Sequence, residues 1–188
     1  MARTRDTRID DAILTATVDL LGAVGYREFT MGAVAARAGV HRPAVYRRWP
    51  SKRHLVVEAV ARQLGVTPTP DTGDLRRDLV TGISTLVRAL AGTALGRALP
   101  ALVADLASDP ELAAEFRRRV FDPRRETTAA ALRSAMARGE IAPDTDMDFV
   151  LDALAAPLYY RVLFGHLPLT ERLAEQSVDT VLAALRPE

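Results

Sequence analysis

Apolar residues recur along this chain at intervals of three and four positions, the spacing that gathers them on one side of an α-helix. Glycine and proline interrupt the spacing in the first third of the chain, at Gly25, Gly39 and Pro50. This part of the chain is therefore predicted to form helices over residues 13–25, 30–38, 41–49 and 51–64.

The same spacing continues to the C-terminal end, and no stretch shows the alternation of a strand bounded by hairpin turns. A kink or a fresh helix is expected at Asp122-Pro123, and a bend or a break at Pro157. N-caps are predicted at Thr30, Ser51, Asp109, Thr145 and Thr170. The further helices are predicted over residues 74–91, 95–107, 109–138, 145–164 and 170–185. The fold class is therefore all-α, with about nine helices.

The segment GVTPTPDTG, residues 65–73, is rich in glycine and proline and is the best candidate for a domain boundary. It separates an N-terminal domain, residues 1–64, from a larger C-terminal helical domain, residues 65–188. Residues 1–63 carry a formal charge of +5 and residues 64–188 carry −4. This asymmetry indicates that the N-terminal domain meets a polyanion, with random scatter of surface charge as the alternative.

Composition narrows the classes of protein further. Aromatic residues make up only 5% of the chain, so its core is expected to consist mainly of Leu, Val and Ala. The chain has no cysteine, which excludes disulfides, thiolate metal sites and a cysteine nucleophile. The N-terminal stretch is charged and unlike a signal peptide, and the apolar run over residues 150–165 is interrupted by charge and proline. We expect a soluble, cytoplasmic protein with no membrane span.

The stretch GVHRPAVYRRWPSK, residues 39–52, combines several positive charges with two large aromatic side chains. Three short helices with a tight turn at Gly39 make a helix-turn-helix, whose last helix lies in the DNA major groove. Arg42 and Arg47 can fork onto guanine edges or phosphates, and Tyr46 can offer its hydroxyl to a phosphate. Two helix starts also offer free N–H groups and polar side chains to phosphates, from Thr30, Ser51 and Lys52.

A longer set of fixed positions runs through this part of the chain: Gly25-Tyr26, Phe29-Thr30, Val34-Ala35, Ala38-Gly39-Val40, Val45-Tyr46, Trp49, Ser51-Lys52 and Leu55. In this register, over about residues 8–64, the chain resembles the tetracycline-repressor (TetR) type of transcriptional regulators. The resemblance implies DNA contacts from Thr30, Arg42, Tyr46, Arg47 and Lys52, and we add His41 as a candidate. The chain departs from the family pattern at His41, Pro43 and Ala44, where the recognition helix begins, so the operator sequence does not carry over.

Several side chains admit a second interpretation. Arg47 and Arg48 are adjacent on a helix and cannot both point into the groove, so Arg47 is predicted to face DNA and Arg48 to be solvated. Trp49 is predicted to fill the core between the third and fourth helices, with base stacking as the alternative. The arginine clusters at 117–119 and 124–125 stand beside glutamates, and they are predicted to form a solvated face rather than a second nucleic-acid patch.

In the C-terminal domain the resemblance is one of architecture rather than motif. It implies a homodimer formed through the last two helices, and a cavity for a small-molecule effector that releases a repressor from its palindromic operator. Two apolar stripes are candidates for the dimer interface and equally for intramolecular core: Leu154, Leu158, Val162, Val178, Val181, Leu182 and Leu185. The candidate walls of the cavity, each with core packing as the alternative, are Leu102, Leu106, Phe116, Phe121, Tyr159, Tyr160 and Phe164.

Two other classes of protein compete with this hypothesis. An enzyme or di-metal protein on a helical bundle would need Glu-x-x-His pairs or a nucleophile motif. The chain has neither, and its three histidines, His41, His54 and His166, lie far apart in the sequence. No catalytic, metal or cofactor site is therefore predicted. A ligand-independent DNA-binding protein would be expected to spread basic charge over its whole surface, whereas here the charge is concentrated in the first third.

Overall fold

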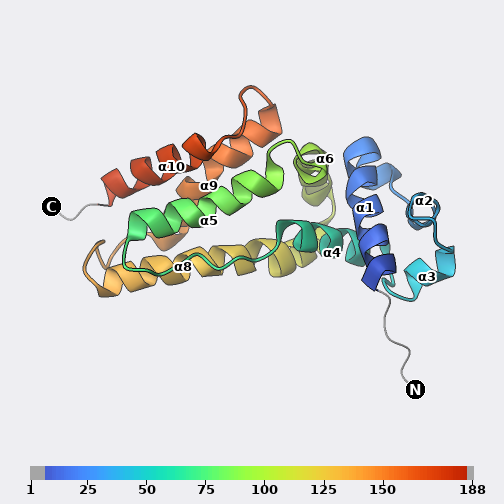
Figure 1. The fold of residues 1–188 in the computed structure, drawn as a ribbon, viewed down its shortest axis with the longest axis horizontal. Helices are drawn as coiled ribbons and strands as arrows, with labels where there is room; N and C mark the ends of the chain where they lie inside the picture. Colours follow the sequence, from blue (N-terminus) through green and yellow to red (C-terminus); the bar gives the residue numbers. More distant parts are fainter. Residues whose placement is uncertain (1–6, 186–188) are drawn as a thin grey trace, which may run out of the picture. The chain divides into compact units, whose positions relative to one another are not determined.

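The computed structural model describes residues 7–185, and within that range it contains ten α-helices, one π-helical turn and no strand (Figure 1). The all-α prediction is confirmed. Residues 1–6 of the predicted N-terminal domain and 186–188 of the C-terminal domain lie outside the described range. The elements are α1 (Thr7–Glu28), α2 (Met31–Arg37), α3 (Arg42–Tyr46), α4 (Lys52–Leu64), α5 (Leu75–Leu90), α6 (Ala94–Ser108), α7 (Pro110–Phe116), η1 (Arg117–Phe121), α8 (Asp122–Ala137), α9 (Met147–Phe164) and α10 (Glu171–Ala184).

Most helix starts follow from local sequence. The side chains of Thr30, Asp109 and Thr170 each accept a hydrogen bond from the backbone N–H three residues later, as N-caps do. The cap predicted at Thr145 is wrong by one residue, because Asp146 accepts the N–H of Phe149 instead. A fresh helix begins at Asp122 after the π-helical turn, which confirms the expectation of a kink or a fresh helix at Asp122-Pro123.

Contacts divide the chain into two compact units, which are described separately. The first unit comprises residues up to Leu64 together with Ala94–Val120, and the second comprises Gly65–Thr93 together with the residues from Phe121 onward. The predicted boundary between residues 64 and 65 is one of the three points where the chain passes between units. Helices α6 and α7, which the sequence assigned to the C-terminal domain, pack with the N-terminal helices.

Small residues explain why α6 joins the first unit. A Cβ atom at Gly22 of α1 would lie 3.4 Å from the carbonyl oxygen of Ala94 and 3.8 Å from the Cβ of Ala98 on α6. At Gly25, where a positive φ of 71° breaks α1, an added Cβ atom would lie 3.7 Å from the Cβ of Ala101. Side chains longer than that of alanine at these positions would hold the two backbones apart, so small residues on both helices permit the close packing of α1 on α6.

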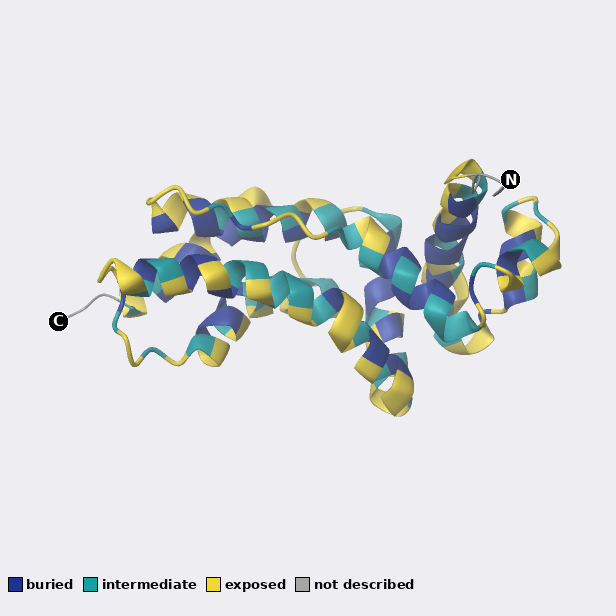
Figure 2. Cartoon of the chain, turned by 90° about the horizontal axis from the view of Figure 1, so that it is seen from below, coloured by how far each residue is buried: buried dark blue, intermediate teal, exposed yellow. Residues whose placement is uncertain are grey.

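The second unit places α5, α8, α9 and α10 side by side as a helical bundle (Figure 1). Each helix turns buried leucine, valine or alanine residues inward, and Figure 2 shows these as the dark inner stripes. Helix α9 carries apolar residues on both its buried side and its exposed side. Leu154 and Leu158 are buried against the other helices, whereas Phe149, Tyr160, Leu163 and Phe164 are exposed. These four exposed residues form the outer face of α9.

The prediction of a solvated face is wrong for Arg124. Its guanidinium is half-buried and donates hydrogen bonds to the carbonyl oxygen of Gly65 at 2.7 Å and to the hydroxyl of Thr85 at 3.1 Å. Burial lowers the pKa of Arg124, and the nearby Tyr159 opposes that shift. Arg124 therefore ties α8 to α5 and to the residue that follows α4. Arg125, by contrast, pairs with two exposed carboxylates.

Among the described residues, no single helix is both long and apolar enough to cross a membrane, although α5 and α6 taken as a pair satisfy the criteria of length and composition.

Replacing Gly82 by alanine should lower the free energy of unfolding of the second unit by about 1–3 kcal/mol, the usual cost of overpacking. A Cβ atom at this position of α5 would lie 2.6 Å from the hydroxyl oxygen and 3.2 Å from the methyl carbon of Thr69. Thr69 is buried, and its hydroxyl lies 3.1 Å from that of Thr128, so it has little room to move. Urea denaturation would measure the change.

Gly22→Ala is the matched control, because its Cβ would meet nothing closer than 3.4 Å. This variant should leave the free energy of unfolding unchanged or raise it by up to about 1 kcal/mol. Equal stability of the two variants would contradict this account.

Candidate nucleic-acid interface

The turn between α2 and α3 is built around a glycine in the left-handed region. Gly39 has a φ of 65°, and the N–H of Val40 donates to the carbonyl of Ala35 at 2.9 Å while the N–H of Gly39 donates to that of Ala36 at 3.2 Å. This pair of bonds is the Schellman motif, which favours glycine because other residues are strained there. The sequence therefore fixes where α2 ends and where the chain turns into α3.

Helix α3 contains only five residues, too few for a helix to be stable alone. Tertiary packing has to hold it. Val45 is fully buried, and Trp49, just beyond the helix, is 2% exposed. The prediction that Trp49 fills the core is therefore confirmed. Of the four valine and leucine residues also predicted to be core, Val34, Val45 and Leu55 are fully buried, whereas Val40 is only half-buried.

The opposite side of α3 carries most of the predicted DNA contacts, and all of them are exposed: His41, Arg42, Tyr46 and Arg47. Tyr46 is 41% exposed although it is a large aromatic residue. The guanidinium of Arg42 donates to its hydroxyl at 3.1 Å and lies 5.3 Å from the centre of its ring. The exposed side of α3, about one helical turn long, thus presents one hydroxyl and two guanidinium groups. These are hydrogen-bond donors suited to phosphates and guanine edges.

Arg48 points the other way. Its Nε donates to the carboxylate of Asp10 in the first turn of α1, and its Nη1 donates to the carbonyl of Ala44 at 3.1 Å. The side chains of Arg48 and Asp10 are only 11% and 7% exposed. Of the two adjacent arginines, Arg47 is therefore the one whose side chain is open to solvent, whereas Arg48 is buried in an ion pair rather than solvated.

Lys52, the first residue of α4, is held against the end of α1. Its ammonium lies 4.1 Å from the centre of the Tyr26 ring and donates to the carbonyl of Arg27 at 3.2 Å. Burial lowers the pKa of Lys52, while nearby carboxylates, that of Asp105 first, oppose the shift. Asp105 of α6 in turn accepts the N–H of Tyr26 at 2.7 Å, just after the break in α1. The position of Lys52 thus depends on both α1 and α6.

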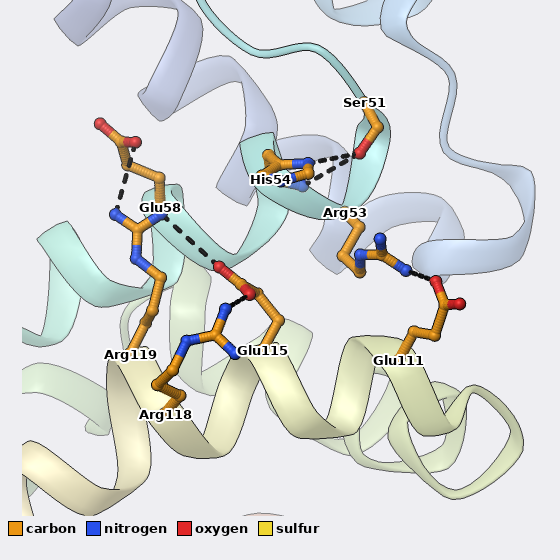
Figure 3. A network of polar contacts seen from close by, with 8 residues as sticks. All are labelled: Ser51, Arg53, His54, Glu58, Glu111, Glu115, Arg118 and Arg119. Atoms are coloured by element: carbon orange, nitrogen blue, oxygen red, sulfur yellow. Dashed lines mark hydrogen bonds and ion pairs between the residues drawn. The ribbon is translucent and has the colours of Figure 1, made fainter.

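Hydrogen bonds between neighbouring residues also fix the starts of α2 and α4. The hydroxyl of Thr30 accepts the N–H of Ala33 at 3.1 Å, and Thr30 itself is exposed. Ser51 lies at the start of α4, with its hydroxyl 2.7 Å from Nδ1 of His54 (Figure 3). Farther along the same helix, Arg53 pairs with Glu111 of α7.

Figure 3 also shows how α4 is joined to the π-helical turn. Glu58 of α4 lies 3.7 Å from Arg119, which is also 3.7 Å from Glu115. Glu115 is buried and pairs with Arg118 as well. These ion pairs fix α4, and with it Ser51 and Lys52, on α7.

The first unit therefore contains all six predicted DNA contacts, four around α3 and one at the start of each flanking helix. Their contact with DNA stays a prediction. Sequence reasoning missed the residues that hold them, namely Asp10, Tyr26 and Asp105. Asp10 resembles an ordinary acidic residue in the first turn of a helix, and no local spacing relates it to an arginine 38 positions away.

The candidate walls of the effector cavity are divided between the two units. Leu102 is buried in the first unit, and Leu106 and Phe116 are half-buried there. In the second unit, Phe121 and Tyr159 are half-buried, and burial raises the pKa of the Tyr159 hydroxyl. Tyr160 and Phe164 are 57% and 69% exposed in the single chain, with ring centres 4.8 Å apart. Their exposure is that of a surface rather than of the interior of a cavity.

The candidate dimer stripes are mostly covered within the chain. Leu154, Leu158 and Val178 are fully buried, and Val181 is buried too. Val162, Leu182 and Leu185 are half-buried. The four buried residues join α9 to α10, so the surface that α9 leaves open to a partner is its outer face.

A cavity of about 610 Å³ opens in the second unit at the start of α5. Four charged residues, Asp74, Arg76, Glu140 and Asp179, contribute to its lining, and Arg76 pairs with Asp179 across it. Leu182 and Leu185 line it as well, but none of the candidate effector walls does. Its charged lining makes it unlike the mostly apolar pockets that hold drug-sized ligands.

Comparison with known proteins gives matches over both halves of the chain. Residues 13–59 match the family described as "Bacterial regulatory proteins, tetR family", and residues 69–181 match "Tetracyclin repressor-like, C-terminal domain". The HTH-type transcriptional regulator YdeS of Bacillus subtilis is 32% identical over 162 residues, which cover 86% of this chain and 81% of that protein. The DNA-binding transcriptional repressor TetR of Mycobacteroides abscessus is 33% identical over 177 residues, 93% of this chain and 92% of its own. The crystal structure of the TetR family transcription regulator SCO0332 superposes with a TM-score of 0.70 at 31% identity, covering 95% of this chain and 99% of that one.

Proposed function

Because this chain belongs to the tetracycline-repressor family of transcriptional regulators, we propose that it binds a specific palindromic DNA operator through α3 and represses transcription until a small-molecule effector releases it. The main support for DNA binding is that α3 has one buried side and one exposed, positively charged side. Val45 holds the helix to the core, while Arg42, Tyr46 and Arg47 face outward. In helix-turn-helix proteins the outward side of this helix enters the major groove.

A homodimer is the second part of the proposal. Two copies of α3 about 34–36 Å apart would reach successive major grooves of a palindromic site. The outer face of α9 supports dimerisation, because it exposes Tyr160, Leu163 and Phe164 on a helix that also has a buried apolar side. We place the protein in the cytoplasm, where it meets chromosomal DNA.

The effector is the third part, and its support is the match of residues 69–181 to the C-terminal domain of the tetracycline repressors. Family members bind small molecules in that domain and DNA in the other. An effector releases DNA only if it prefers the released conformation, by a coupling free energy of typically about 1–3 kcal/mol. Among the candidate walls in the second unit, Tyr159 and Phe121 are the two that are half-buried rather than exposed.

Selection from a pool of random genomic fragments tests the function directly. We expect repeated rounds of binding and amplification to enrich one near-palindromic sequence, and gel-shift titration to give tighter binding to it than to unselected fragments. Enrichment of no sequence, at low ionic strength and with protein freed of small molecules, would overturn the proposal.

Replacing Lys52 by methionine should weaken binding to all DNA sequences alike and reduce the slope of log affinity against log salt concentration by about one. The reason is that an ammonium at a helix start interacts with a phosphate, which carries no sequence information. Fluorescence anisotropy on specific and random duplexes at several salt concentrations would measure both quantities. Arg62→Met is the matched control, since Arg62 is an exposed cation of the same helix paired with Asp11. A Lys52→Met protein with an unchanged salt slope would show that the ammonium stays with Tyr26 when DNA binds.

A further inference from the structure

We propose that the buried ion pair between Asp10 and Arg48 is a positioning device, which fixes the orientation of α3 on α1 and so determines how sharply the protein distinguishes its operator from other DNA. The inference rests on the proposed function, because specificity is defined only for a protein that selects a sequence. Neither residue was predicted to bind DNA, and both are nearly closed to solvent.

The geometry joins two helices through one guanidinium. Arg48 follows α3 by two residues, and its Nη1 donates to Ala44, a residue inside that helix, at 3.1 Å. Its Nε donates to Asp10, whose carboxylate lies in the first turn of α1. The guanidinium therefore bonds the backbone of the recognition helix to the longest helix of the first unit.

Directional bonds matter here because α3 is so short. Val45 and Trp49 are buried, and their apolar contacts keep the helix attached. Apolar burial is non-directional, so it leaves rotation and tilt of a one-turn helix weakly determined. A charge-assisted hydrogen bond to a planar guanidinium has a preferred distance and plane. The ion pair thus sets the direction in which Arg42 and Arg47 leave the surface.

The cost of burying two charges supports a role in specificity rather than in stability. Apolar residues of similar size often give equal or greater stability than a buried ion pair, and fixing one arrangement is an attested reason for keeping such a pair. A matched pair in the same unit shows the contrast. Asp19, also on α1, pairs with Arg37 of α2 at 3.1 Å, but those side chains are 35% and 53% exposed. An exposed pair of this kind contributes little to position.

The test compares Asp10→Asn, Arg48→Met and the double variant Asp10→Asn/Arg48→Met with the control Asp19→Asn. Affinities for the duplex that the wild type selects and for random duplex are measured by fluorescence anisotropy over a range of salt concentrations. We expect each Asp10 or Arg48 variant to lower the ratio of specific to random affinity by about tenfold or more, because misdirected arginines lose base contacts but keep phosphate contacts. Affinity for random DNA and the salt slope should stay as in the wild type. Asp19→Asn should change none of these quantities.

The double variant allows the inference to be tested even if one of the single variants fails to fold. Asp10→Asn leaves a guanidinium buried without its carboxylate, which is strongly destabilising, whereas the double variant buries no unpaired charge. A double variant that melts cooperatively and keeps the wild-type ratio would overturn the inference, since the pair would then be only structural. An Arg48→Met protein that loses affinity for all DNA alike, with the salt slope reduced by about one, would overturn it too, because Arg48 would be a phosphate contact. If the wild type selects no sequence, the proposed function and this inference fail together.

Discussion

Replacing Trp49 by alanine should lower the free energy of unfolding of the first unit by about 3–5 kcal/mol, the range found when a packed tryptophan is deleted from a core. The side chain is 2% exposed, between the end of α3 and the start of α4, so its removal leaves a cavity where both helices are anchored. Urea denaturation followed by circular dichroism would measure the loss. Fluorescence is unsuitable, because this is the only tryptophan in the chain.

Two further measurements separate a core role from a DNA contact. Trp49→Phe keeps an apolar ring in the same place and should cost clearly less than the alanine variant. At temperatures where Trp49→Ala is folded, its affinity for random DNA should equal that of the wild type, since no phosphate contact has been removed. A variant with an unchanged unfolding midpoint and weakened DNA binding would show instead that the indole stacks on bases.

The burial of Trp49 was predictable because it depends on local pattern. An apolar side chain four positions after Val45, at the end of a charged stretch, points to a core position. Caps such as Thr30 and the glycine turn at Gly39 were predictable for the same reason. Hydrogen bonds within four or five residues of the chain determine them.

Contacts between distant residues were not predictable in this way. Asp10 and Arg48 are each unremarkable in sequence, and only the tertiary fold of the first unit brings them together. Arg124 looked like part of a solvated arginine cluster, yet its guanidinium reaches a backbone carbonyl 59 positions away. A charged residue carries no local sign of whether the fold will bury it.

The domain boundary shows the same limit on a larger scale. The sequence marks where α4 ends, through Gly65 and the prolines that follow. It does not mark that α6 packs on α1, because the responsible residues, Gly22 and Ala98 among them, are small rather than distinctively patterned. Close approach of two helices depends on side chains being absent, and many helices contain alanine for other reasons.

Helix α9 presents a related ambiguity, since an apolar residue can face the core of its own chain or a partner. The stripe through Leu154 and Leu158 has the spacing of a buried face, and so does the outer face of α9. Sequence alone left both roles open for the first stripe. The burial of its residues within the second unit gives the physical basis for separating the two.

Replacing Leu154 by alanine should therefore lower the free energy of unfolding of the second unit by about 2–5 kcal/mol, because the side chain is fully buried between α9 and its neighbours. Phe164→Ser is the matched variant on the outer face. It should change the free energy of unfolding of the single chain by no more than about 0.5 kcal/mol, as an exposed substitution does, and raise the dissociation constant of the proposed dimer.

Analytical ultracentrifugation would measure the dissociation constant of each protein, and denaturation at several protein concentrations would separate association from folding, since a dimer gains stability with concentration. Phe164→Ser should shift the concentration dependence, whereas Leu154→Ala should lower the midpoint at every concentration. If Leu154→Ala dissociated the dimer while the single chain unfolded at the wild-type midpoint, the stripe through Leu154 would be part of the subunit contact. The second unit would then have to rearrange when two copies associate.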